Sequence, residues 1–212
     1  FQVRSRTEIL EQIRQLKIFH GRNLENYNAL FLGNHDALAA GDELIYLAGS
    51  EASKIFGFEG TRTNTPMLFF FGSVDSLLKS KSELFEKISS LPFYTYINIG
   101  FESIDPPTLK FIGKPISASM IQEAFTKMLE INATYPNIEM TDNFLMGKTL
   151  RPEHYQSLAE LLGDVSVPSK GKGAIYLSPI KDSPKKRELL PQFFEIKNQS
   201  QLPVFFYLIQ RL

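Results

Sequence analysis

Residues 96–115 read YINIGFESIDPPTLKFIGKP, a stretch that predicts a β-strand followed by a helix. It opens with four residues rich in β-branched and aromatic side chains, passes through a glycine, and places Glu102 and Ser103 where the strand should end. Two prolines then precede a new helical pattern. Because the carboxyl ends of strands handle ligands in α/β proteins, Glu102 and Ser103 are candidate functional residues. The alternative is that Glu102 only caps the next turn.

The same pattern of a short apolar strand, polar or glycine-rich residues and a helix recurs on both sides of this stretch. Continuous apolar runs such as 67–71 are typical of strands buried on both faces of a parallel sheet. Apolar residues spaced three and four apart indicate the helices. Besides the opening stretch, the sequence predicts strands at 29–32, 67–71, 138–145 and 174–177. It predicts helices at 6–20, 38–48, 77–90, 117–132 and 153–162.

Strands that alternate with helices predict an α/β fold with right-handed parallel crossovers, either a doubly wound sheet or a barrel. No G-x-G-x-x-G follows any predicted strand, so the dinucleotide-binding form has no support. Polar residues follow five successive strands, and such strand ends converge on one face only in a barrel. We therefore expect a partial TIM-type (β/α)6 barrel. We also expect one domain over 1–212, with 185–212 as a C-terminal helical closing segment.

Composition excludes several function classes. The 212 residues carry 23 lysines and arginines against 23 aspartates and glutamates, which gives no net field to attract nucleic acid or an acidic membrane. No run approaches the roughly 20 apolar residues that span a bilayer. Without a signal-peptide core we expect a cytoplasmic protein, in which the sequons at Asn132 and Asn198 are chance matches. The chain has no cysteine, so it cannot form a disulfide or a thiolate-bound metal cluster.

The run INIGFESIDPPTLKFIGKP, followed by a helix and then NFLMG, resembles the radical S-adenosylmethionine enzymes. The likeness is strongest to the branch whose fourth strand ends in a G-x-E-S element. It implies that Glu102 accepts hydrogen bonds from the ribose hydroxyls of S-adenosylmethionine, a role that suits an acceptor-only carboxylate. Ser103 would lie beside it, within reach of the ribose or the methionine carboxylate.

Residues 29–180 fall into register with that family. The resemblance implies that residues 33–36 occupy a GGE-like motif for the methionine amino group, although only the first glycine matches. It places the third-strand residues Ser73 and Asp75 toward the active site. It places the fifth-strand residues Asn143 and Gly147 near the nucleoside, without the family's full G-x-I-x-G-x-x-E. The sixth strand, AIYLSPI, would pass close to the adenine. Beyond Glu102 and Ser103, the implied cofactor contacts are Gly33, Asn34, His35, Asp36, Ser73, Asp75, Asn143 and Gly147.

The family's C-x-x-x-C-x-x-C loop, which follows the first strand and binds a 4Fe–4S cluster, is absent from this chain, as is that strand. Either the loop was cut off, which a start at Phe1 favours, or the barrel is naturally degenerate. In the intact enzyme the resemblance implies reductive cleavage of S-adenosylmethionine to a 5′-deoxyadenosyl radical, which abstracts hydrogen from a substrate that the sequence does not identify. That reaction needs an electron donor. This chain alone should be inactive.

Three other functions remain as alternatives. The first is a non-redox accessory module that binds S-adenosylmethionine or a nucleoside on a degenerate barrel. The second is a TIM-barrel hydrolase with Glu102 and His35 as acid and base. The third is a metallophosphoesterase, suggested by the string GNHD at 33–36, whose dinuclear metal centre activates water. That centre needs more histidines than this chain has. The chain contains three, His20, His35 and His154.

Overall fold

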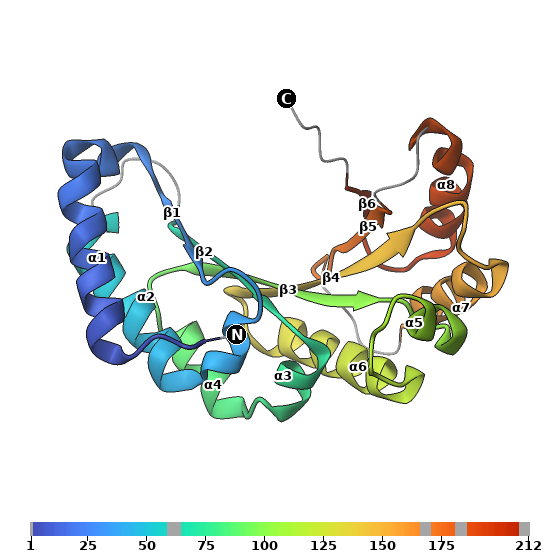
Figure 1. The fold of residues 1–212 in the computed structure, drawn as a ribbon, viewed down its shortest axis with the longest axis horizontal. Helices are drawn as coiled ribbons and strands as arrows, with labels where there is room; N and C mark the ends of the chain where they lie inside the picture. Colours follow the sequence, from blue (N-terminus) through green and yellow to red (C-terminus); the bar gives the residue numbers. More distant parts are fainter. Residues whose placement is uncertain (1, 59–64, 166–170, 181–185, 208–212) are drawn as a thin grey trace. The chain divides into compact units, whose positions relative to one another are not determined.

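The computed structural model describes residues 2–58, 65–165, 171–180 and 186–207 (Figure 1). It confirms an α/β fold with a six-stranded, all-parallel sheet of order β1-β2-β3-β4-β5-β6. This consecutive order, without a reversal, is that of a TIM-type barrel wall rather than of a doubly wound sheet. The strands are β1 Ala29–Leu32, β2 Met67–Gly72, β3 Tyr94–Glu102, β4 Ile138–Met146, β5 Ile175–Pro179 and β6 Val204–Phe206.

The chain forms two compact units, Phe1–Ile97 with Tyr135–Glu139 and Asn98–Thr134 with Met140–Leu212. The first unit contains α1 Arg6–His20, the 3-10 helices η1 Gly21–Asn26 and η2 Ala37–Ala40, α2 Asp42–Phe56, α3 Val74–Lys79 and α4 Ser82–Ser89. Helix α1 packs on α2, and α2 packs on α4. In β2, Leu68 and Phe70 are buried while their neighbours Phe69 and Phe71 are more open, so the strand buries one face most fully.

Two predictions in the first unit are wrong. The segment 38–48 is not a single helix, because the 3-10 helix η2 ends at Ala40 and α2 begins at Asp42. The segment 77–90 is not a single helix, because α3 ends at Lys79 and α4 begins at Ser82. Ser80 has extended backbone angles, and its hydroxyl donates to the carbonyl oxygen of Ser76 at 2.6 Å. Serine hydroxyls compete in this way with the helical hydrogen-bond ladder, which accounts for the break.

The second unit contains α5 Pro106–Phe111, α6 Ala118–Thr134, α7 Pro152–Gly163, the 3-10 helix η4 Lys186–Leu189 and α8 Leu190–Gln199. Its core includes Phe101, whose ring contacts those of Phe125 and Phe144. The buried Asn132 closes α6 onto β4, since its amide accepts from the Met140 nitrogen at 2.7 Å and donates to the Met140 oxygen at 3.0 Å. The carboxyl ends of three neighbouring strands, β3, β4 and β5, belong to this unit.

The closing segment 185–212 is not helical throughout. Helix α8 is followed by the sixth strand β6, which pairs with β5 through Ile175 and Val204. Residue 185 and residues 208–212 lie outside the described residues. Among the helices that are described, none is long and apolar enough to cross a membrane.

Candidate functional site

Strand β3 ends in a strained turn at Glu102. The φ angle of this residue is 68°, and among the described residues other than glycine it alone has a positive value. The Ser103 N–H donates to the Phe101 carbonyl at 2.8 Å, so the chain reverses through a three-residue γ-turn. A γ-turn with positive φ is rare and costs about 1–3 kcal/mol for a residue with a side chain. Such strain persists only where the surrounding structure enforces it.

Helix α5 returns the chain from this turn to Glu102. The Asp105 carboxylate caps the helix by accepting from the Thr108 N–H at 3.0 Å, and Pro106 takes the first helical position. Helix α5 ends at Phe111, and Gly113 then adopts a φ of 70°, with the Lys114 N–H donating to the Leu109 carbonyl at 2.9 Å. This is a Schellman motif. It places the Lys114 ammonium 3.5 Å from the Glu102 carboxylate. Lys114, which follows the helix, thus returns to the end of the strand that precedes it.

Side chains from β4 and β5 complete the surroundings of Glu102. The Asn143 amide nitrogen lies 3.4 Å from the Glu102 carboxylate, and the Ser178 hydroxyl donates to the Asn143 amide oxygen, which orients the amide. Gly100 leaves room for the carboxylate, because a Cβ atom there would lie 2.8 Å from Glu102 Oε1. The Glu102 side chain is 20% exposed, and both of its contacts are long. It can therefore accept shorter hydrogen bonds from a ligand.

The other two predicted site residues of this unit directly follow β3 and β4 and contact side chains of α7. Ser103 is fully buried, and its hydroxyl contacts His154 Nδ1 at 2.7 Å. Gly147 is held by the Tyr155 hydroxyl, which accepts from the Gly147 N–H at 2.9 Å and donates to its carbonyl at 2.8 Å. Sequence reasoning missed His154 and Tyr155, since a lone histidine on a predicted helix carries no signal of a partner 51 residues away.

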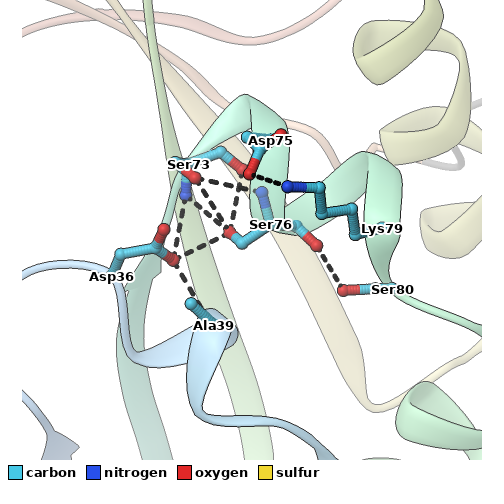
Figure 2. A network of polar contacts seen from close by, with 7 residues as sticks. All are labelled: Asp36, Ala39, Ser73, Asp75, Ser76, Lys79 and Ser80. Atoms are coloured by element: carbon cyan, nitrogen blue, oxygen red, sulfur yellow. Dashed lines mark hydrogen bonds and ion pairs between the residues drawn. The ribbon is translucent and has the colours of Figure 1, made fainter. Parts of the chain in front are cut away.

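In the first unit, Asp36 joins the ends of β1 and β2. One of its carboxylate oxygens accepts from the Ala39 N–H at 3.3 Å, the Ser73 N–H at 3.2 Å and the Ser76 hydroxyl at 2.7 Å (Figure 2). Ser73 in turn caps α3 through Ser76. Asp75 is exposed and pairs with Lys79 at 2.7 Å within α3. The structure thus joins Asp36 to Ser73, and Asp75 takes no part in that contact.

The remaining predicted residues, Gly33, Asn34 and His35, follow β1 and are exposed. They line a cavity of about 430 Å³ whose walls are mostly apolar side chains of α1, β1 and α2. No group of three or more histidine, aspartate or glutamate side chains among the described residues could hold a metal ion. The GNHD residues at 33–36 are therefore not part of any such group among the described residues.

Comparison with known proteins adds no family to these observations. No protein-family model matches the chain, and no curated protein matches it. What is established is a parallel α/β protein with six strands that alternate with helices. A fold of this kind hosts many functions, so the function has to be inferred from the Glu102 site.

Proposed function

We propose that this chain is the S-adenosylmethionine-binding part of a radical S-adenosylmethionine enzyme, in which Glu102 binds the ribose. One observation carries the proposal. A carboxylate lies at the carboxyl end of a parallel strand, on a strained backbone, and its contacts among the described residues are 3.4 and 3.5 Å long. Strained residues cluster at ligand-binding sites, and strand carboxyl ends are where α/β proteins bind ligands.

The chemistry of the Glu102 site suits a ribose. A carboxylate only accepts hydrogen bonds, and the two neighbouring hydroxyls of a ribose can donate one to each of its oxygens. Hydroxyl-to-carboxylate bonds are typically about 2.5–2.7 Å long, shorter than the 3.4 and 3.5 Å contacts to Asn143 and Lys114. A bound ribose would therefore add stronger hydrogen bonds to these contacts. Asn143 and Lys114 would then keep the carboxylate in place.

Gly100 contributes space to the same site. The Glu102 carboxylate lies over the Gly100 backbone, where any larger residue would place a methyl group 2.8 Å from it. S-adenosylmethionine supplies the reactive group when bound, and the residues of this chain bind and orient it.

An iron–sulfur cluster does not fit the residues of this chain. The sequence has no cysteine, and the described residues include no other group of metal ligands. A cluster held by thiolates would need ligands from outside the 212 residues. An electron donor would in turn need that cluster in order to act. The proposed function of this chain is therefore limited to binding the cofactor.

The lack of cysteine favours one second function, a non-redox module that binds S-adenosylmethionine or a nucleoside. The two functions share the Glu102 site and differ in what accompanies it. A C-x-x-x-C-x-x-C motif in the same polypeptide or a partner would favour the enzyme. A natural protein that lacks the motif would favour the module.

Calorimetric titration of S-adenosylmethionine into the wild type and Glu102→Ala tests the proposal. A hydrogen bond to a charged group is worth about 1.5–3 kcal/mol, so Glu102→Ala should weaken binding by about tenfold to a hundredfold. Glu160→Gln is the matched control, because this exposed carboxylate of α7 lies in the same unit and outside the site. Equal affinity of the wild type and Glu102→Ala would contradict the ribose role.

A further inference from the structure

A buried serine–histidine pair adjoins Glu102. Ser103 follows Glu102 in the chain, and His154 lies in the first turn of α7. Neither side chain is exposed, and the distance from Ser103 Oγ to His154 Nδ1 is 2.7 Å. The pair links the end of β3 to a helix that begins 50 residues later in the sequence.

The pair does not resemble the activated nucleophile of a hydrolase. A nucleophilic serine has to reach the substrate, whereas Ser103 is fully buried. The far nitrogen of a catalytic histidine is oriented by a carboxylate in the Ser-His-Asp arrangement. Here His154 Nε2 lies 2.9 Å from the Leu145 carbonyl oxygen, within its own unit. These contacts indicate a structural role for both residues.

The directions of the hydrogen bonds follow from their partners. Burial lowers the pKa of His154, so the ring is neutral at neutral pH. The Leu145 carbonyl can only accept, so Nε2 carries the proton and Nδ1 is the acceptor. The Ser103 hydroxyl therefore donates to Nδ1. Its oxygen also accepts from the Asp105 N–H at 3.0 Å.

Ser103 therefore fixes the backbone on the far side of the strained residue. Its N–H closes the γ-turn onto Phe101, and its hydroxyl is held between His154 and Asp105. Released from these contacts, Glu102 would relax to a negative φ, the ordinary region for a residue with a Cβ atom. The carboxylate would then leave its place over Gly100.

We propose that Ser103 and His154 are positioning residues, which hold Glu102 in the γ-turn and so aim its carboxylate at the ligand. This inference rests on the proposed function only for the identity of that ligand. The conformation of Glu102 tests the inference without any ligand, so the two can fail separately.

Two substitutions of His154 form a matched pair. In His154→Asn the amide oxygen can take the place of Nδ1 and still accept from Ser103, but the donor to Leu145 is lost. In His154→Gln the amide nitrogen can take the place of Nε2 and still donate to Leu145, but the acceptor for Ser103 is lost. Each variant keeps one of two buried hydrogen bonds, so a general loss of stability should affect both alike. Ser103→Ala removes only the hydroxyl.

Titration of S-adenosylmethionine into these variants gives the first measurement. His154→Gln and Ser103→Ala should weaken binding about tenfold, the loss expected for one misplaced charged hydrogen bond. His154→Asn should stay within about threefold of the wild type, as rescue by the variant that keeps the Ser103 contact. Equal losses in His154→Asn and His154→Gln, or no loss in Ser103→Ala, would overturn the positioning role.

Crystal structures of ligand-free Ser103→Ala and His154→Gln give the second measurement. We expect φ of Glu102 to become negative in both, with loss of the Lys114 and Asn143 contacts, and to stay near 68° in His154→Asn. A positive φ in all three variants would overturn the inference. If the wild type fails to bind S-adenosylmethionine, the proposed function is wrong, and the φ angle alone decides the positioning role.

Discussion

Asp36 and Glu102 are both carboxylates that follow a strand of the parallel sheet, yet the structure uses them differently. Asp36 receives three hydrogen bonds of 2.7–3.3 Å from one neighbouring strand end and its own turn (Figure 2). Glu102 has contacts of 3.4 and 3.5 Å from Asn143 and Lys114. Position after a strand therefore does not distinguish a carboxylate that its protein neighbours bind from one that is available to a ligand. The number and the length of the carboxylate's hydrogen bonds to the protein distinguish the two.

The backbones of the two residues differ in the same sense. Asp36 has a φ of −97°, which any residue adopts, whereas Glu102 has a φ of 68°. Asp36 stabilises the turns that it joins. Glu102 costs free energy in its turn, and other residues have to hold it there. We therefore expect substitution of Asp36 to lower stability and substitution of Glu102 to lower binding.

The largest expected effect on stability is that of Asp36→Ala. Loss of the acceptor leaves the Ser73 N–H and the Ser76 hydroxyl without this partner, so the free energy of unfolding should fall by about 2–4 kcal/mol. Urea denaturation measures it. Asp75→Ala is the control, because its exposed ion pair with Lys79 should contribute less than about 1 kcal/mol. Equal losses in the two variants would break the contrast with Glu102.

A third carboxylate, Asp142 on β4, extends the comparison to complete burial. It has no exposed surface, and neither oxygen has a hydrogen-bond partner within the described residues. An unsatisfied buried polar group costs about 1–3 kcal/mol. Asp142→Leu, which has the same branched shape, should therefore raise the free energy of unfolding by about that amount at pH 7. A loss of stability would show instead that the buried carboxyl stabilises the fold.

The same residue predicts a pH dependence. Burial raises the pKa of Asp142 well above its usual value, so the folded protein keeps the proton that the unfolded chain releases near pH 4. Its contribution to stability is fully present at low pH and is lost as the pH rises from about 4 through the folded-state pKa. Asp142→Asn should remove this slope between pH 4 and 8 in urea titrations. An unchanged slope would assign it to other groups.

The smallest expected effect concerns the strain at Glu102. Glycine adopts positive φ without a steric penalty, so Glu102→Gly should be more stable than Glu102→Ala by about 1 kcal/mol. Both variants lack the carboxylate, and both should bind S-adenosylmethionine weakly. Thermal unfolding of the pair measures the difference. A Glu102→Ala variant that is as stable as Glu102→Gly would show that the turn is not strained.

The sequence predicts the larger elements of this fold because their side-chain patterns are long. The run at 67–71 and the helical spacing at 6–20 correspond to β2 and α1. The three-residue strand β6 was not predicted, since three residues after a proline carry no period. Helix α5 is hard to recognise because its two prolines look like a break, although Pro106 occupies the first helical position.

The candidate site could be predicted only in part. Glu102 is a candidate because it follows a predicted strand and lies in a stretch that resembles a family motif. Its positive φ, the return of Lys114 and the orientation of Asn143 by Ser178 all depend on contacts between distant elements. The partnership of Ser103 with His154 leaves no local pattern in the sequence. Spacing also could not show that Asp36 is bound to neighbouring turns.

Titration with S-adenosylmethionine and its 2′-deoxy analogue tests the central claim, that Glu102 binds the ribose, most directly. The wild type should prefer S-adenosylmethionine about tenfold or more, as expected for one hydrogen bond to a charged group. Glu102→Ala should bind both compounds equally and weakly, because the carboxylate that distinguishes them is gone. The same preference in the wild type and in Glu102→Ala would contradict the claim.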